Sequence, residues 1–204
     1  MLSLFQIVSG SFLKMLAIAM YSHRVQGLEK IKGLEDSGVI FVSNHCSLID
    51  GPVGGMALPV SFLPIRFLAT EDYFSLKDNR MPKGFKWVSP LYTRMNGCIK
   101  VYSKQNPHDA LAKVLLALEK KAKIWVFPEG TRTKDGNLQK GKPGAAYLHK
   151  HSGAPIVPVG LMGTFKPKPF RNKMVVKFGD PIYLQSRSLK KITNTIMRRI
   201  ELLT

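Results

Sequence analysis

Short apolar runs alternate along this chain with stretches in which apolar residues recur every three or four positions. The runs predict strands at 38–43, 97–102, 124–127, 155–162 and 174–178. The periodic stretches predict helices at 50–58, 108–122, 143–151 and 188–203, with Asn106 as a cap and Gly153 just beyond an end. Residues 61–95 fit neither pattern, because an apolar piece is followed by a Gly-, Pro- and Lys-rich stretch typical of a loop. Strands alternating with helices predict an α/β domain, with a largely parallel sheet flanked by helices.

The first 21 residues have a different pattern. Residues 2–21 are mostly apolar, and their small or polar residues recur at intervals of three or four, which predicts an amphipathic helix with a wide apolar face. This pattern fits a helix that lies in a membrane surface or a helix packed on the protein's own core. It fits a membrane-spanning helix or signal peptide less well, because Gln6 and Lys14 interrupt the apolar run. We expect the helix in the membrane surface, and divide the chain into a membrane-associating helix at 1–24 and a globular domain at 25–204.

The charge of the chain limits the classes of molecule that it is expected to bind. Its 204 residues include 31 Lys and Arg against 13 Asp and Glu, so the formal net charge is +18. Such a chain is expected to meet nucleic acid, an anionic membrane surface or phosphorylated small molecules. The two cysteines do not make a disulfide framework, and a reducing, cytosolic setting fits best.

A polar cluster, SNHCSLID at 43–50, follows the first predicted strand. In parallel sheets the working residues usually lie just beyond the carboxyl ends of strands. His45 and Asp50 can meet if the strand ends in a turn and a helix begins near Asp50. The carboxylate would then hold the imidazole, whose other nitrogen could take a proton from a substrate hydroxyl. Spacing alone favours the simpler interpretation, in which His45 caps the strand and Asp50 caps the next helix.

A second cluster, FPEGTR at 127–132, follows another predicted strand. Gly130 permits a tight turn with free backbone N–H groups, and Arg132 can bind a phosphate through two parallel hydrogen bonds. Glu129 could accept a hydrogen bond from a substrate hydroxyl or hold a neighbouring arginine. Taken alone, the cluster is equally typical of an ordinary charged turn.

Together the two clusters resemble the glycerolipid acyltransferase family, whose type members acylate 1-acyl-glycerol-3-phosphate. The resemblance rests on Asn44-His45-x-x-x-x-Asp50, on FPEGTR some 80 residues later and on APIVPVG at 154–160. Asp135-Gly136 and the run from Lys140 to Ala145 add to it, and it covers roughly residues 25–180.

The resemblance implies that His45 is the general base and that Asp50 orients it. The acceptor hydroxyl would attack the thioester of an acyl-coenzyme A or acyl-carrier protein, with no metal, no cofactor and no acyl-enzyme. The residues implied to hold the acceptor and its phosphate are Asn44, Glu129, Gly130, Thr131 and Arg132. The partners implied are the acyl thioester, a lysophospholipid and an anionic membrane surface. We expect a peripheral or monotopic enzyme on the cytoplasmic face of a membrane.

One element departs from the family pattern of Gly-x-Ile-x-Val-x-Arg. Ser103 stands at the arginine position, and Lys100 and Lys104 are its possible replacements. Because a lysine offers a point charge and not a planar fork, the acceptor could be lysophosphatidate, another lysolipid or another hydroxylated molecule.

Other functions compete with this interpretation. A basic chain can bind nucleic acid, but no recognition motif is visible. A non-catalytic lipid-binding protein would also explain the charge, although not the His45/Asp50 pair. The sequence from Gly136 to Lys142 resembles a P-loop, but Pro143 has neither the hydroxyl nor the N–H that such a loop needs. His149 and His151 lack a third metal ligand.

Overall fold

The computed structural model describes residues 4, 8, 22–70, 93, 97–102, 106–168, 170–171, 173–186 and 188–204. The expected N-terminal helix over residues 2–21 therefore lies outside the described residues, apart from Leu4 and Val8. Within the described ranges, no helix has the length and apolar character needed to cross a membrane.

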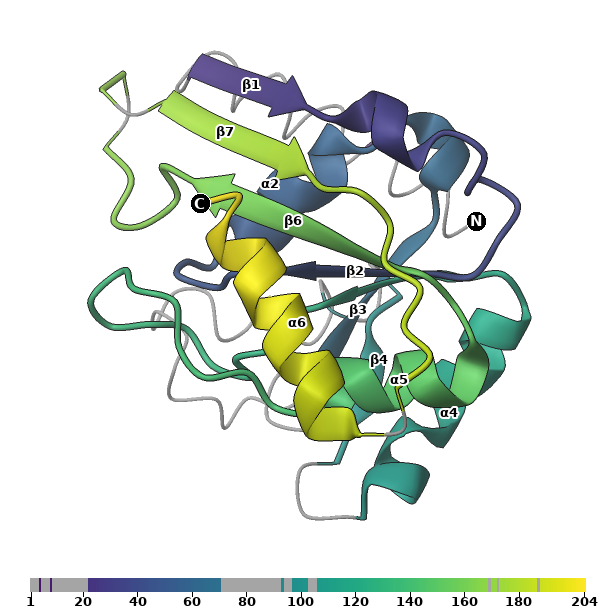
Figure 1. Ribbon diagram of the computed structural model, residues 1–204. Coiled ribbons are helices and arrows are strands. Elements are labelled where there is room, and N and C mark those ends of the chain that lie inside the picture. Colours follow the sequence, from purple (N-terminus) through teal and green to yellow (C-terminus); the bar gives the residue numbers. More distant parts are fainter. Residues whose placement is uncertain are drawn as a thin grey trace.

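A seven-stranded sheet forms the centre of the fold, in the order β1-β7-β6-β2-β5-β3-β4 (Figure 1). The strands are β1 (Ser22–Gln26), β2 (Val39–Ser43), β3 (Ile65–Thr70), β4 (Ile99–Val101), β5 (Lys123–Val126), β6 (Ile156–Met162) and β7 (Lys173–Phe178). Strands β2 to β6 run parallel to one another. Strand β7 is antiparallel to β6, and β1 runs parallel to β7. The predicted α/β fold with a largely parallel sheet is confirmed.

The direction of the strands defines two edges of the sheet. Strands β2 to β6 end at one edge, here called the carboxyl edge, where β1 and β7 begin. It lies on the left in Figure 1, where the loops that follow β5 and β6 project beyond the sheet. The opposite edge is here called the amino edge. The two polar clusters at 43–50 and 127–132 therefore lie at the same edge, as a parallel sheet requires.

Helices cover both faces of the sheet and bury two apolar cores. The helical elements are η1 (Leu28–Ile31), α2 (Asp50–Ala57), η2 (Val60–Phe62), α4 (Pro107–Glu119), α5 (Gly144–Ser152) and α6 (Leu189–Glu201). Ile40, Ile124 and Ile156 face a core shared with α4, α5 and α6. Phe41, Trp125 and Val157 face the second core, against η1 and α2. Each buried strand alternates between the two cores because successive side chains point to opposite faces.

Close packing fixes the position of α2, the helix that carries Asp50. A Cβ built on Gly54 would lie 2.5 Å from the ring of Trp125. Since real Cβ contacts are longer than this, only glycine lets α2 approach the sheet so closely. The start of α2 at Asp50 is thereby held beside the end of β2.

The main differences between the structure and the predicted elements concern β1, β3 and the end of α4. Strand β1 was not predicted, and it includes the expected boundary between residues 24 and 25. Strand β3 lies in the region that fitted neither pattern. The helix predicted at 108–122 ends at Glu119, because Lys121 adopts a positive φ of 62° just before β5 begins. The predicted cap at Asn106 is confirmed, since its side chain accepts a hydrogen bond from Asp109 N.

Candidate active site

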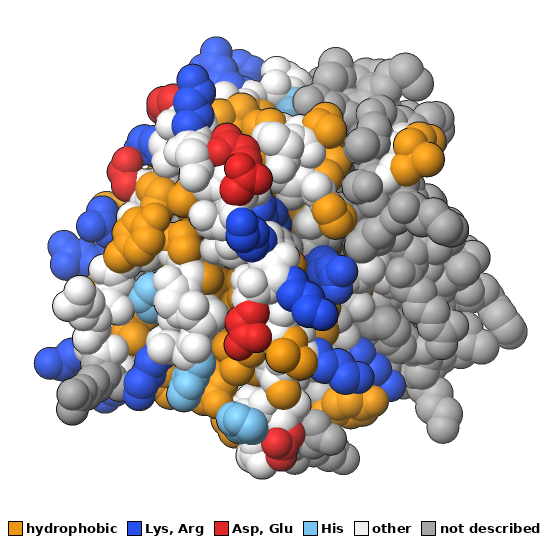
Figure 2. Space-filling model, turned by 90° about the vertical axis from the view of Figure 1, so that its right-hand side faces the viewer, with side chains coloured by type: hydrophobic (Ala, Val, Ile, Leu, Met, Phe, Trp, Pro, Cys, Tyr) orange, Lys and Arg blue, Asp and Glu red, His pale blue; other side chains and the backbone are white. Residues whose placement is uncertain are grey.

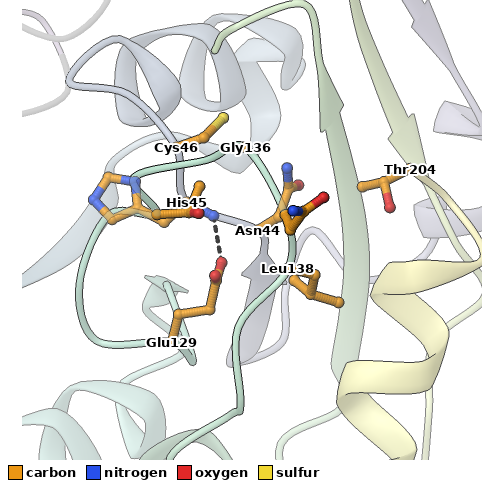
Figure 3. Close-up of a pocket in the computed structure, with 9 residues that line it drawn as sticks. Asn44, His45, Cys46, Glu129, Gly136, Leu138 and Thr204 are labelled. Carbon is orange, nitrogen blue, oxygen red and sulfur yellow. Dashed lines mark hydrogen bonds between the residues drawn. The ribbon is translucent and has the colours of Figure 1, made fainter.

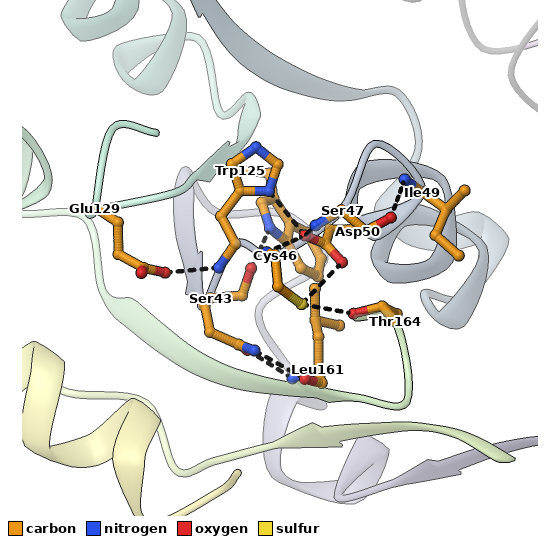
Figure 4. Close-up of polar contacts among 11 residues, drawn as sticks. Ser43, Cys46, Ser47, Ile49, Asp50, Trp125, Glu129, Leu161 and Thr164 are labelled. Carbon is orange, nitrogen blue, oxygen red and sulfur yellow. Dashed lines mark hydrogen bonds and ion pairs between the residues drawn. The ribbon is translucent and has the colours of Figure 1, made fainter. Parts of the chain in front are cut away.

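The side chains of His45 and Asp50 meet at the carboxyl edge. His45 Nδ1 lies 2.8 Å from Asp50 Oδ2. The same oxygen accepts hydrogen bonds from the backbone N–H groups of Cys46, at 2.6 Å, and Ser47, at 2.7 Å (Figure 4). Because that oxygen acts as an acceptor, the hydrogen of the imidazole belongs on Nδ1 and Nε2 is left able to take a proton. Asp50 is fully buried, whereas the His45 side chain is 15 % exposed and can be reached.

Glu129 holds the backbone of His45. Its Oε1 accepts a hydrogen bond of 2.6 Å from His45 N (Figure 3). Its Oε2 accepts one of 2.9 Å from Gln139 N. The residue is only 2 % exposed. Burial raises the pKa of the Glu129 carboxyl above its ordinary value, and the two backbone N–H groups oppose that rise.

The chain after β5 encloses His45. Thr133 N donates a hydrogen bond of 2.9 Å to the carbonyl oxygen of His45, so both backbone polar groups of His45 are bound to this segment. The ring of Phe127 stacks on the imidazole, with centroids 3.9 Å apart and planes 17° from parallel. Residues 130–132 lie between these two anchoring bonds, which keeps the FPEGTR cluster next to the imidazole.

Lys142, to which the sequence pattern assigned no role, lies over this loop. Gly130 has a φ of +70°, and a Cβ built there would lie 2.8 Å from Lys142 Nζ and 2.9 Å from its Cδ. Lys142 N also donates a hydrogen bond of 2.7 Å to the carbonyl oxygen of Pro128. Glycine at position 130 therefore provides both the backbone turn and the space in which the Lys142 side chain lies.

Cys46 points away from the imidazole, as its place next to His45 in the chain predicts. Its Sγ lies 3.1 Å from Thr164 Oγ1 and 3.8 Å from Asp50 Oδ1. Burial, and then the charge of Asp50, raise the pKa of the thiol to about 11. At neutral pH the group is a thiol, and only a thiolate is a strong nucleophile.

Asn44 is bound into the sheet. Its side-chain amide donates to the carbonyl oxygen of Leu161 and accepts from Leu161 N, both at 2.8 Å. This pair of bonds continues the pairing of β2 with β6 beyond the last residue of β2. Asn44 thus fixes the direction in which the chain leaves the strand toward His45.

Of the two lysines expected to replace the family arginine, the structure describes Lys100, and it does not lie beside His45. Lys100 lies in β4 at the edge of the sheet, three strands from β2 and so roughly 14 Å across it. Its ammonium lies 4.9 Å from the centre of the Tyr102 ring. Ser103 and Lys104 lie outside the described residues.

A small pocket lies behind His45. Its lining includes Asn44, Leu138 and Thr204, from which the imidazole points away (Figure 3). Its volume of about 40 Å³ is far below the roughly 300–1,000 Å³ of small-molecule sites. This pocket is too small to hold a small-molecule substrate.

Comparison with known proteins identifies one family. The model of the family described as Acyltransferase matches residues 22–162. The chain is 31% identical over 160 residues to the chloroplastic 1-acyl-sn-glycerol-3-phosphate acyltransferase BAT2 of Brassica napus, covering 78% of this chain and 43% of the relative. It is 30% identical to the chloroplastic enzyme LPAT1 of Arabidopsis thaliana, covering 78% of this chain and 41% of the relative. The chain thus spans about two fifths of the length of these two relatives.

The fold matches that of a solved acyltransferase. The crystal structure of the 1-acyl-sn-glycerophosphate (LPA) acyltransferase PlsC from Thermotoga maritima superimposes with a TM-score of 0.65. The match covers 100% of this chain and 78% of that chain, at 22% sequence identity. This likeness supports the described architecture.

Proposed function

Because this chain belongs to the acyltransferase family, we propose that it moves a fatty acyl group from an acyl thioester to the free hydroxyl of a lysolipid. The acceptor that its relatives' names favour is 1-acyl-glycerol-3-phosphate, which would give phosphatidate. The observation that carries the proposal is the 2.8 Å contact between His45 Nδ1 and the buried Asp50, which leaves Nε2 to act as a base.

His45 removes the proton from the acceptor hydroxyl as the oxygen attacks the thioester carbonyl. Asp50 holds the hydrogen on Nδ1 and stabilises the imidazolium that forms. Phe127, stacked on the ring, keeps the imidazole in one plane. The acyl carbon forms a bond to the acceptor oxygen and loses its bond to sulfur, and His45 returns the proton to the departing thiolate. No acyl-enzyme is formed, which agrees with the protonated state of Cys46.

The phosphate of the acceptor lies against the loop at residues 130–132. Arg132 offers a planar cation and Thr131 a hydroxyl, and Lys142 adds a second cation over Gly130. A contact between Glu129 and the substrate remains a prediction. It is not favoured by the structure, because both oxygens of Glu129 already accept backbone hydrogen bonds and the residue is buried. Contacts through Lys100 and Lys104 likewise remain predictions.

The donor is an acyl-coenzyme A or an acyl-carrier protein, and the enzyme works at the cytoplasmic surface of a membrane. The net charge of +18 supports binding to anionic lipids and to either donor, since both carry negative charge. The expected helix at residues 2–21 would contribute to membrane binding.

The proposal is tested by incubating the purified full chain with oleoyl-coenzyme A or an oleoyl-acyl-carrier protein and a panel of lysophospholipids, and identifying products by mass spectrometry. We expect phosphatidate from lysophosphatidate, and none from the His45→Ala variant. Product from a different lysolipid alone would keep the reaction and replace the acceptor. Failure with every acceptor and with both classes of donor would reject the enzyme.

A further inference from the structure

The loop between β6 and β7, residues 163–172, carries an unusual combination of side chains. Phe170 is 82% exposed. Residues 163–173 also contain Lys166, Lys168, Arg171 and Lys173, and no acidic residue. An exposed aromatic ring leaves apolar surface in contact with water, and the boundary of an anionic bilayer would both take up such a ring and attract the cations around it.

The backbone of the loop holds this arrangement outward. Lys166 and Phe170 adopt φ angles of 43° and 62°, a region that costs energy for residues other than glycine. Arg171 N donates a hydrogen bond of 3.2 Å to the carbonyl oxygen of Lys168, which closes a turn just before β7. Such local strain is retained where the position of a side chain matters.

The base of the same loop is fixed to the candidate active site. Thr164 is fully buried and contacts Cys46, the neighbour of His45. The ring of Phe165 lies against Gly136, since a Cβ built there would be 3.1 Å from it. Seating the tip of the loop on a surface therefore sets the distance of His45 from that surface.

Charge is distributed differently at the amino edge and in the β6–β7 loop. Among the described residues, four exposed acidic side chains lie near the amino edge. Glu29 follows β1 and Asp180 follows β7, whereas Asp36 precedes β2 and Glu119 precedes β5. Figure 2 looks at this side of the molecule, where red acidic side chains lie among the blue ones. These acidic side chains offset cations at the amino edge, whereas the β6–β7 loop contains no acidic residue, so an anionic surface attracts that loop more strongly.

We propose that the β6–β7 loop is a membrane-docking element, in which Phe170 inserts among the lipids of an anionic bilayer while Lys166, Lys168, Arg171 and Lys173 contact their head groups. Ser22, the first residue of β1, pairs with Lys173, so the chain leaving the expected N-terminal helix joins the sheet beside this loop. Docking there presents the carboxyl edge to lipid acceptors. The inference goes beyond the proposed reaction, because it can be measured without acyl transfer.

Tryptophan fluorescence of the full chain tests the insertion. Phe170→Trp is compared with Tyr183→Trp, a matched control, because Tyr183 is 64% exposed and follows Ile182, which pairs with Ile156 at the amino edge. With phosphatidylglycerol vesicles carrying brominated acyl chains, we expect a blue shift and quenching for Phe170→Trp, beyond the wild-type signal, and neither for Tyr183→Trp. An unchanged Phe170→Trp signal, or equal quenching of both, overturns the proposal.

Vesicle sedimentation provides a second readout. Because each basic residue near an anionic surface strengthens binding about fivefold, Lys166→Glu/Arg171→Glu should weaken binding at least roughly 25-fold. The same reversal at the amino edge, Lys32→Glu/Lys120→Glu, should leave binding nearly unchanged. If the loop variant binds vesicles normally and loses only transfer from acyl-carrier protein, the surface belongs to that acidic protein and the membrane assignment is wrong.

Discussion

Replacing Glu129 by glutamine tests whether this carboxylate positions His45 or contacts the acyl acceptor. In Glu129→Gln an amide NH₂ replaces one of the two accepting oxygens, so one buried backbone N–H, of His45 or Gln139, faces another donor. A hydrogen bond to a charged group contributes about 1.5–3 kcal/mol, and a buried donor without a partner costs about 1–3 kcal/mol. A neutral amide is easier to bury than a carboxylate, which offsets part of the loss. We expect unfolding in urea to show a net loss of about 2 kcal/mol.

The same substitution moves the general base. A misplacement of about 1 Å costs roughly 100-fold in rate, so we expect kcat to fall about 10- to 100-fold. The KM for lysophosphatidate should stay within about twofold, because a positioning residue acts equally on free and bound enzyme. Initial rates of thiol release over a range of acceptor concentrations measure both constants, with Glu119→Gln, on the exposed end of α4, as the control. A tenfold higher KM with unchanged kcat would refute the reasoning, since that pattern indicates direct contact with the acceptor.

Three further predictions follow from the contacts around the site. Lys142→Met should raise the KM for lysophosphatidate roughly tenfold by removing a cation from the phosphate, whereas the exposed neighbour Lys140→Met should not, as acceptor titrations will reveal. Cys46→Ala should keep activity within about threefold and intact-protein mass spectrometry should detect no acyl adduct, because the thiol stays protonated; a hundredfold loss would contradict this. Hydrogen bonds from Thr133 and Asn137 lower the pKa of Asp135 to about 2, so this carboxylate stabilises the fold above its ordinary pKa and loses that effect as pH falls toward 2. Melting temperatures of Asp135→Asn should therefore lie below those of the wild type at neutral pH and approach them in acid.

The buried parts of the fold could be predicted from the sequence because burial dictates composition. Strands β2, β5 and β6 are buried almost throughout, so their sequences are continuous apolar runs. Strand β1, SHRVQ, lies at the edge of the sheet and alternates between exposed and half-buried residues, which leaves Val25 as its one strongly apolar side chain. Strand β3 has apolar residues, but the Pro64 before it and the loop-like sequence after it hid the run.

Contacts between two side chains of the candidate site could be predicted from the sequence. Contacts between a side chain and the backbone were harder to predict. The pairing of His45 with Asp50 required only a turn and a helix start, which the pattern predicted. The partners of Glu129 are two backbone N–H groups, and no residue type reports where a backbone N–H will point. Lys142 was missed for a similar reason, because its position over Gly130 depends on how the loop folds back against the Pro128 carbonyl.

The product balance of a single reaction tests the central claim most directly. Wild-type protein and His45→Ala are each given oleoyl-coenzyme A with and without lysophosphatidate, and both free thiol and phosphatidate are quantified. If His45 activates the acceptor hydroxyl, wild-type protein releases thiol only with the acceptor present, in equal amount with phosphatidate, and His45→Ala loses at least about 1,000-fold of this rate. Thiol release without acceptor, or an active His45→Ala variant, would contradict the account.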